Sequence, residues 1–232
     1  MTEVIDRLVS EAVSEDTSIF HLGDPISKHG LSLANAIEQH LIADWPEWLI
    51  DFRIGFGQLL IQYHIDLIDH QQLVEILQIL VAEEAQELCY SSYSVIQIPT
   101  CYDPRVAPDL LKLSEQIGLS TSEIVSLHQS VNYKVIATGF APGFGYLAET
   151  PNQLHVPRKK IPLTRIPPGS VAIAENQTVI YPKETPGGWH LIGRTQLQLS
   201  SMNNQDISAI FKLGQTVRFI EISYDQFMSE KQ

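Results

Sequence analysis

The spacing of apolar residues predicts six elements in the first hundred positions of the chain. The predicted strands cover residues 18–22, 50–56, 59–63 and 93–98, and the predicted helices cover residues 31–42 and 73–88. A turn at Gly55–Gly57 joins the two middle strands. The order β-α-β-β-α-β is the split βαβ arrangement, so we expect a ferredoxin-like α+β domain over residues 17–98.

The residues ahead of the first strand show a helical pattern. Apolar side chains occupy positions 4, 5, 8, 9, 12 and 13, which lie on one face of a helix. We therefore expect residues 1–16 to form a helical extension.

The second half of the chain alternates short β-prone runs with glycine and proline. These runs cover residues 133–139, 170–174, 178–182, 189–193, 196–200 and 216–222. Two short helices, 108–117 and 120–128, precede them, and Ser120 with Glu123 has the spacing of a capping box. The pattern is typical of a mainly-β domain, which we place at residues 99–232.

Negative charge is concentrated in the first half. The net charge is −12, and residues 1–99 carry three basic and 16 acidic side chains. This disfavours nucleic acid and anionic membranes as partners, and it argues against a DNA-reading role for the two short helices. No apolar run approaches the roughly 20 residues that span a bilayer. With two cysteines and no secretory pattern, we expect a cytoplasmic protein.

Glycine- and proline-rich blocks crowd residues 138–195. They are Gly139–Leu147, Pro157–Arg158, Ile166–Ala174, Gln177–Pro182 and Pro186–Thr195. Glycine permits backbone conformations that other residues avoid, and proline removes conformational freedom, so such loops are stiff. Because stiff loops mainly place groups against a ligand or partner, we expect a prepared site at the mouth of a small barrel.

His128 is the candidate catalytic residue. It ends the predicted helix 120–128, where an imidazole can act as a general acid or base. The alternative, which the sequence alone favours, is a structural histidine placed against the helix dipole.

Five polar side chains in the blocks are candidates for binding a small polar substrate or an anion. They are Tyr146, Arg158, Gln177, Thr178 and Arg194. Arginine forks suit carboxylates and phosphates, and amide and hydroxyl groups suit polar substrates. The ordinary alternatives are exposed salt bridges and hydrogen bonds within turns. Arg165 is a further anion candidate, whereas Lys159 and Lys160 are expected in a solvated loop.

The remaining candidates are loop residues that would wall a pocket or dock on a partner. They are Phe140, Pro142, Gly143, Phe144, Gly187, Gly188 and Trp189. Most aromatics belong to a core, but flanking glycines and prolines favour a surface role here. We predict that Tyr146, Arg158, Gln177 and Arg194 converge on one polar cavity or on a junction with another polypeptide.

Two kinds of site are excluded by motif. The eight histidines show no H-E-x-x-H or comparable ligand spacing, so we expect no metal site. The sequence has no P-loop, so any ATP chemistry would need machinery from elsewhere.

The same blocks, in this order, resemble the family variously called the B subunit of 5-oxoprolinase, Kip-type kinase inhibitor and allophanate hydrolase subunit 1. The resemblance covers roughly residues 17–225, with weaker support from Ile98–Tyr102, Pro108–Leu110 and Leu127–His128. It implies a ferredoxin-like domain followed by a cyclophilin-like β-barrel. Glu175-Asn176 stands where the family commonly has a glycine pair.

The resemblance implies the B subunit of a bacterial ATP-dependent 5-oxoprolinase, a hydrolase that opens 5-oxoproline (pyroglutamate) to L-glutamate. It would be inactive without the A and C subunits of 5-oxoprolinase, and ATP with Mg would serve the assembled complex rather than bind tightly to this chain. Arg158 and Arg194 would then bind carboxylate or phosphate, and His128 would move a proton. The alternatives are an inhibitor of a sporulation-type histidine kinase and a component that acts on allophanate.

Overall fold

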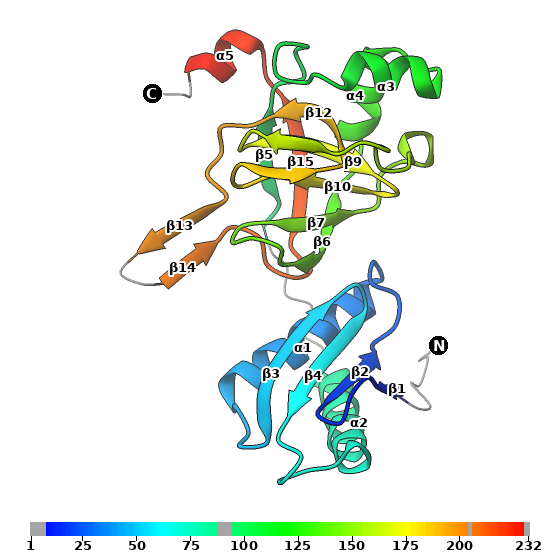
Figure 1. Cartoon of the computed structure of the whole chain (residues 1–232), viewed down its shortest axis with the longest axis vertical. Coiled ribbons are helices and arrows are strands. Elements are labelled where there is room, and N and C mark those ends of the chain that lie inside the picture. The colour runs from blue at the N-terminus through cyan, green and yellow to red at the C-terminus, as the bar shows by residue number, and fades with distance from the viewer. Residues whose placement is uncertain (1–7, 88–93, 204–205, 230–232) are drawn as a thin grey trace. The chain divides into compact units, whose positions relative to one another are not determined.

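The computed structural model describes residues 8–87, 94–203 and 206–229, and the chain folds as two compact units (Figure 1). The first unit is Met1–Ser92 and the second is Tyr93–Gln232. In the part that the structure describes, no helix is long and apolar enough to cross a membrane.

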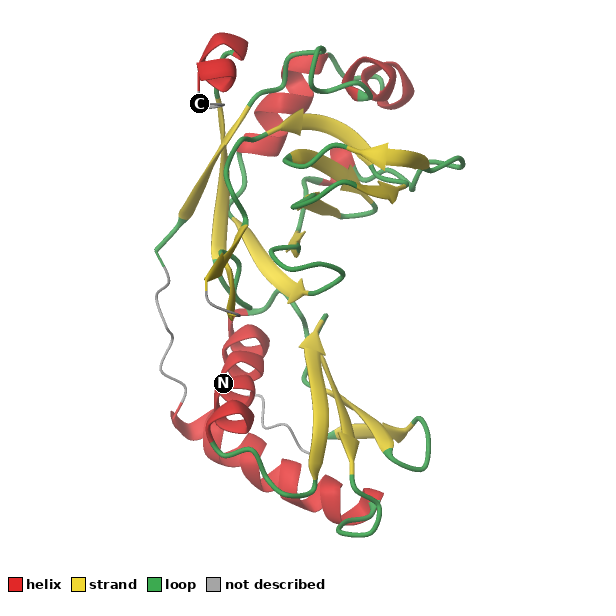
Figure 2. Ribbon diagram, turned by 60° about the vertical axis from the view of Figure 1, so that its left-hand side comes forward, coloured by secondary structure: helices red, strands yellow, loops and turns green. Residues whose placement is uncertain are grey.

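The first unit is an antiparallel sheet with two helices on one face (Figure 2). Its elements are β1 Val9–Ala12, β2 Thr17–His21, α1 Lys28–Ala43, β3 Leu49–Gly55, β4 Gln58–Tyr63 and α2 His70–Glu87. The strand order is β1-β2-β4-β3. Alternation along the strands buries Phe20, Leu59 and Ile61, while the helices bury Ile37 and Leu77.

The helix predicted at the N-terminus is wrong where the structure describes it. Val9–Ala12 form β1, which pairs antiparallel with β2, Val9 opposite His21 and Ala12 opposite Ser18. Without β1, that edge of β2 would leave its backbone groups unpaired in the sheet. Hydrogen bonding between strands thus overrides a helical spacing of apolar residues.

The strand predicted at residues 93–98 is Ile96–Thr100, β5, and it does not complete the sheet of the first unit. It pairs in parallel with β15, Thr216–Glu221, in the second unit, where Ile98 lies opposite Phe219. In the first unit β1 takes the outer place beside β2 that a ferredoxin-like sheet gives to its fourth strand. The other elements predicted for this unit are confirmed, with shifts at their ends.

The second unit is built around a curved, mainly antiparallel sheet. Its first elements are β5, α3 Leu110–Ile117, α4 Thr121–Gln129, β6 Tyr133–Thr138, β7 Gly145–Ala148, the short 3-10 helix Asn152–Leu154 and β8 Leu163–Ile166. Then follow β9 Ser170–Ala174, β10 Gln177–Ile180, β11 Thr185–Gly187, β12 His190–Arg194, β13 Ser200–Asn203, β14 Asp206–Ala209, β15 and α5 Tyr224–Ser229. Neighbouring strands run in the order β5-β15-β6-β7-β10-β9-β12, and only β5 with β15 is parallel. β8 with β11 and β13 with β14 form separate two-stranded ribbons, the latter extending away from the sheet (Figure 1).

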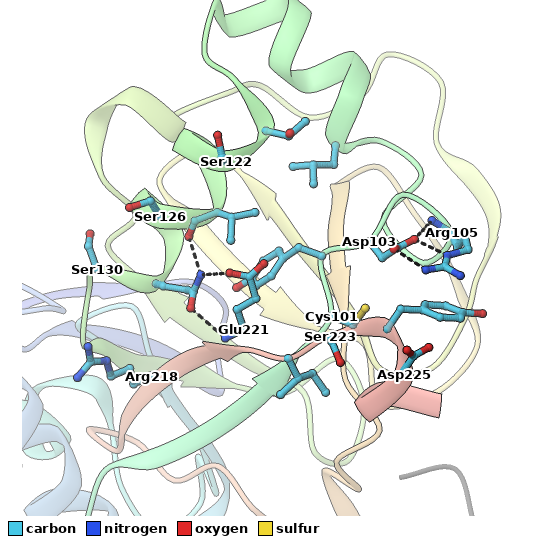
Figure 3. A pocket seen from close by; sticks show the side chains of 17 residues that line it. Cys101, Asp103, Arg105, Ser122, Ser126, Ser130, Arg218, Glu221, Ser223 and Asp225 are labelled. Atoms are coloured by element: carbon cyan, nitrogen blue, oxygen red, sulfur yellow. Dashed lines mark hydrogen bonds and ion pairs between the residues drawn. The ribbon is translucent and has the colours of Figure 1, made fainter. Parts of the chain in front are cut away.

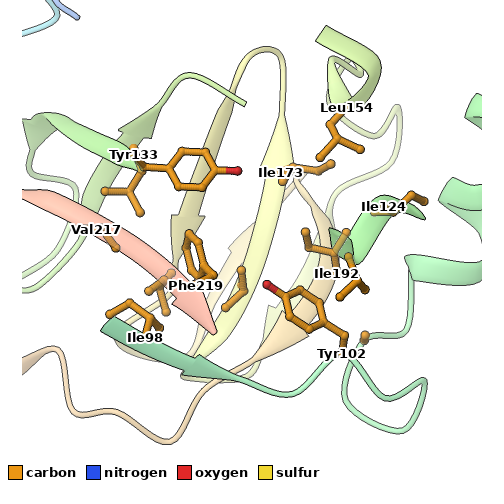
Figure 4. Close-up of a cluster of buried hydrophobic side chains, with 14 of the residues drawn as sticks. Ile98, Tyr102, Ile124, Tyr133, Leu154, Ile173, Ile192, Val217 and Phe219 are labelled. Atoms are coloured by element: carbon orange, nitrogen blue, oxygen red, sulfur yellow. The ribbon is translucent and has the colours of Figure 1, made fainter. Parts of the chain in front are cut away.

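Alternation along β9 divides the apolar residues of this unit into two clusters. Val171 and Ile173 join the main core, which also holds Tyr133, Leu147 and Phe219 (Figure 4). Ala172 and Ala174 join a second cluster on the opposite face of the sheet. The sheet therefore carries apolar contacts on both faces.

Predicted elements of the second unit are partly confirmed. The two short helices exist, and the Ser120–Glu123 capping box is formed in both directions. The strand predicted at residues 196–200 is wrong, because only Ser200 enters a strand; Leu199 is buried from an irregular segment. The strand β7 was not predicted, because most of it lies in a glycine-rich block whose composition indicates a loop.

Candidate functional site

His128 lies in the main core of the second unit and is fully buried. Its Nδ1 lies 2.8 Å from Tyr102 Oη, and its Nε2 lies 2.9 Å from Thr178 Oγ1. The imidazole also packs against Phe219, with ring centroids 4.3 Å apart, and its backbone carbonyl accepts the Tyr133 hydroxyl. Both ring nitrogens are thus used inside the protein.

The hydrogen bonds fix the tautomer of His128. The Thr178 hydroxyl donates to the Ala172 carbonyl at 3.2 Å, so it accepts from His128 Nε2–H. Nδ1 then accepts from the Tyr102 hydroxyl. Burial lowers the pKa of His128 to about 3, so the ring is neutral at ordinary pH.

This burial argues against the predicted proton shuttle. A proton-transferring imidazole must contact its substrate or solvent, and the core seals His128 from solvent. The histidine is not a charged residue at a helix terminus either, because its pKa is lowered rather than raised. Thr178, predicted as a substrate-binding residue, is equally buried and serves the same hydrogen-bonded chain.

The second cluster brings together most of the aromatic residues predicted from the loops. Phe144 contacts Tyr146 and Tyr181, with ring centroids 5.0 and 5.6 Å apart, and Tyr146 lies 6.4 Å from Trp189. The cluster lies over Ala172, whose small side chain leaves room for the rings. Trp189 and Tyr181 are buried, whereas Tyr146 is half-buried.

Arg158 covers the edge of this cluster. Its guanidinium carbon lies 5.6 Å from the centroid of the Trp189 ring, and its side chain is exposed. Among the described residues, no carboxylate pairs with this guanidinium. We call the group formed by Phe144, Tyr146, Arg158, Tyr181 and Trp189 the Arg158 face. Its chemistry suits a small ligand with a carboxylate for the arginine and an apolar or planar part for the rings.

Gln177 on β10 and Arg194 on β12 lie beside opposite ends of β9. In the ladders with β9, Gln177 is opposite Ala174, whereas Arg194 is opposite Ser170. Arg194 is half-buried, its Nε donates to the Pro168 carbonyl at 3.0 Å, and burial lowers its pKa. The predicted convergence of Tyr146, Arg158, Gln177 and Arg194 on one cavity is therefore wrong for Arg194.

The loop that carries Phe140 is a tight, closed turn. Gly139 N donates to the Phe144 carbonyl and Phe144 N donates to the Ala141 carbonyl. Phe140 has a φ of 70° and is 64% exposed, although its ring contacts Phe144. Gly143 is required here, because its φ is +80° and an added Cβ would lie 2.7 Å from the Leu199 carbonyl oxygen. The loop thus presents an aromatic ring and the exposed Pro142.

Two basic residues differ from their predicted roles. Lys159, expected in a solvated loop, pairs with Asp109 at 2.6 Å, and both side chains are largely buried, with 15% and 18% exposure. Arg165, an anion candidate, pairs with Glu184 at the surface. Sequence reasoning did not predict the ion pair between Asp109 and Lys159. The only sequence signal was the position of Asp109 in one of the weaker family motifs.

The second unit also contains an open cavity of about 890 Å³ (Figure 3). It lies between α4, which contributes Ser122 and Ser126, and the segment around Glu221 and Tyr224. Some of its polar groups pair with one another: Asp103 accepts two hydrogen bonds from the Arg105 guanidinium, which lies 3.4 Å from the Tyr224 ring centroid. None of the predicted site residues lines this cavity, and we assign it no ligand.

The described residues contain no cluster of three or more histidine, cysteine or acidic side chains that could hold a metal ion. On the Arg158 face, the exposed groups are the Arg158 guanidinium and part of the Tyr146 side chain, whereas Phe144, Tyr181 and Trp189 are buried beneath them.

The sequence model of one protein family, described as carboxyltransferase domain, subdomain C and D, matches residues 9–210. The chain belongs to this family. Solved structures share the fold of this chain. TTHA0988 superimposes on it with a TM-score of 0.74 at 32% sequence identity, over 89% of this chain and 39% of that one. The urea carboxylase of Kluyveromyces lactis gives a TM-score of 0.70 at 12% identity, over 98% of this chain and 23% of that one, which indicates a shared fold alone.

Curated relatives confirm the resemblance inferred from the motifs. The chain is 45% identical over 125 residues to the B subunit of 5-oxoprolinase from Escherichia coli O157:H7, covering 54% of this chain and 57% of that protein. It is 38% identical over 138 residues to the B subunit of 5-oxoprolinase from Bacillus subtilis (strain 168), covering 60% and 57%. These matches thus span little more than half the length of the relatives.

Proposed function

We propose that this chain is the B subunit of an ATP-dependent 5-oxoprolinase that opens 5-oxoproline to L-glutamate in the cytoplasm. The observation that carries the proposal is the identity of 38–45% to three proteins with that one name. Nothing comparable favours a kinase inhibitor or an allophanate-processing protein, so we do not carry those alternatives forward.

The Arg158 face supplies a place for the substrate. 5-Oxoproline carries a carboxylate on a five-membered ring, which matches an exposed guanidinium over Trp189, with Tyr146 on the same indole ring. In the reaction the ring C–N bond breaks, the carbonyl carbon gains an oxygen from water, and the nitrogen takes up protons. ATP with Mg, held by the assembled complex, would activate the lactam oxygen by phosphorylation, and hydrolysis of that phosphoryl group by a second water would release phosphate beside ADP.

We assign the partner contact to the loop of Phe140 and Pro142. A large exposed aromatic ring on a closed, glycine-braced loop is suited to insert into an apolar pocket of another polypeptide. The A and C subunits of 5-oxoprolinase are the partners that this function requires. The complete site would then form only in the complex, which explains why the chain alone would be inactive.

The finer architecture belongs to the same proposal. We regard the first unit as a ferredoxin-like domain in which β1 replaces the usual last strand, because β2, α1, β3, β4 and α2 keep the expected order. We regard the second unit as a cyclophilin-like barrel, a view that its curved antiparallel sheet and covering helices support.

Reconstitution tests the function. The chain is mixed with the A and C subunits from the same organism, and ATP-dependent release of glutamate from 5-oxoproline is measured. Full activity without this chain would exclude its role in the enzyme. Arg158→Ala should raise KM for 5-oxoproline by about 10- to 100-fold, because a charge-assisted contact worth roughly 1.5–3 kcal/mol is lost.

The matched control is Arg165→Ala, which removes an exposed arginine that pairs with Glu184 and should leave KM unchanged. An unchanged KM in Arg158→Ala would remove Arg158 from the substrate site. In the same preparations, Phe140→Ala should weaken co-elution with the partner proteins, whereas Ile161→Ala, at a residue 84% exposed, should not.

A further inference from the structure

The segment that carries Arg158 is attached to the protein on both sides of that residue. On one side, the Pro157 carbonyl accepts a hydrogen bond from His190 Nε2 at 2.9 Å. On the other, Lys159 N donates to the Gly188 carbonyl at 2.7 Å, and Lys159 Nζ pairs with Asp109 at 2.6 Å. Arg158 therefore lies between two fixed neighbours.

Asp109 joins three elements at this point. Its Oδ2 accepts from Lys159 Nζ and from the Leu191 backbone N–H at 2.8 Å, and its own N–H donates to the Leu191 carbonyl at 3.1 Å. Although Asp109 occupies the N-cap of α3, its side chain makes no capping hydrogen bond. The carboxylate instead ties the start of α3 to β12 and to the Arg158 segment.

The ion pair has little access to water, with side-chain exposures of 15% for Lys159 and 18% for Asp109. Screening by solvent is weaker there than at the surface, so removing one partner leaves a poorly solvated charge. The position of Arg158, by contrast, is set mainly by its backbone and by the cation–π contact with Trp189, since its guanidinium pairs with no described carboxylate. The position of the guanidinium thus depends on the segment that Asp109 holds.

We propose that Asp109 and Lys159 are positioning residues, which hold Arg158 over Trp189 in the geometry that binds the ligand's carboxylate. A displacement of about 1 Å in a binding group can cost about 100-fold in rate, so a rigid support is required. The ligand named in this inference rests on the proposed function, whereas the support of Arg158 over Trp189 does not.

The structural arm of the test uses the full chain labelled with 5-fluorotryptophan. Fluorine NMR gives one signal each for Trp45, Trp48 and Trp189. Arg158→Ala identifies the Trp189 signal and the direction in which it moves when the guanidinium over the ring is lost. Asp109→Asn and Lys159→Met should both move the Trp189 signal in that direction and leave Trp45 and Trp48 unchanged. Lys160→Met, at the exposed neighbouring lysine, is the control and should move none of them.

The kinetic arm uses the reconstituted complex. Asp109→Asn and Lys159→Met should raise KM for 5-oxoproline by about 10- to 100-fold with kcat changed less than about twofold. Lys159→Arg, which keeps a cation for Asp109, should have a KM close to that of the wild type. The double variant should be no worse than either single one, because both remove the same ion pair.

The outcomes separate the two claims. A Trp189 signal that stays in place in both single variants overturns the positioning role. A signal that moves while Arg158→Ala leaves KM unchanged keeps the positioning role and overturns the substrate contact of Arg158.

Discussion

His128 and Arg158 belong to the same unit but to opposite environments, and those environments decide what each side chain can do. The imidazole is buried with both nitrogens hydrogen-bonded, so it stays neutral and holds the core together. The guanidinium is exposed against an indole ring, so it remains available to an anion. In the sequence, both residues are candidates for the functional site because of their chemical type. Only the difference in their burial, which the structure shows, distinguishes them.

The buried chain of Tyr102, His128 and Thr178 predicts a stability effect. His128→Ala should lower the free energy of unfolding at pH 8 by about 2–4 kcal/mol, because it leaves a cavity and removes the ring's hydrogen bonds to the buried Tyr102 and Thr178 hydroxyls. His21→Ala, at an exposed histidine on β2, is the control and should change it by less than about 0.5 kcal/mol.

The pH dependence of the free energy of unfolding offers a second test of the buried, neutral His128. The folded-state pKa of His128 is about 3, below the unfolded value of 6.5, so only the unfolded chain binds this proton between those values. The stability from the neutral ring is complete above pH 6.5 and is lost as pH falls below it. The difference between wild type and His128→Ala should thus shrink by up to about 1.4 kcal/mol per pH unit, measured by urea unfolding at pH 8, 6 and 5. A constant difference would contradict the buried neutral state.

At the scale of elements, the ribbon β8–β11 bears directly on the aromatic cluster. Gly187 in β11 approaches Tyr181 and Ile166 so closely that an added Cβ would lie 2.5 Å from Tyr181 Oη and 2.7 Å from Ile166 Cδ1. Both of those side chains are buried, so neither can move aside freely. At Gly188, the next residue, the nearest atom would lie 3.6 Å from an added Cβ, which is an ordinary van der Waals contact.

The adjacent glycines give a matched pair of variants. Gly187→Ala should destabilise the protein by about 1–3 kcal/mol, because the methyl group overlaps packed atoms. Gly188→Ala should stay within about 0.5 kcal/mol of wild type, since its Cβ meets only ordinary contacts. Thermal unfolding followed by circular dichroism measures both, and equal effects would show that the close approach of Gly187 does not matter.

Other elements show where local pattern and pairing compete. Residues 9–12 have the apolar spacing of a helix but form β1, because the edge of β2 offers backbone partners. Residues 145–148 form β7 within a glycine-rich block, because β6 and β10 lie on either side. In both cases hydrogen bonds to distant strands decide the outcome.

At the scale of the whole molecule, the position of β5 matters most. The predicted boundary placed residues up to 98 in the first unit, yet β5 pairs with β15 and buries Ile98 in the main core of the second. Parallel pairing joins residues more than a hundred positions apart, and no local feature of the sequence specifies it. The compact units accordingly divide between Ser92 and Tyr93.

Truncation tests this division. A fragment of residues 93–232 should fold cooperatively, whereas a fragment of residues 99–232, which lacks Ile96 and Ile98, should lose about 3 kcal/mol or more of stability. Urea unfolding of the two fragments, with tryptophan fluorescence as the signal, makes the comparison. Equal midpoints would mean that β5 contributes little to the second unit.

The sequence by itself determined the helices, most strands, the Ser120–Glu123 cap, the stiff loops and the family, because each depends on residues close together in the chain or on a motif string. It also named Tyr146 and Arg158 as binding candidates and Trp189 as a pocket or partner-loop candidate, and the structure brings those three together. Only the tertiary structure decided that β1 is a strand, that β5 belongs to the second unit, that His128 is buried and that Lys159 pairs with Asp109. Pairing and burial depend on which distant segments meet, and spacing along the chain does not carry that information.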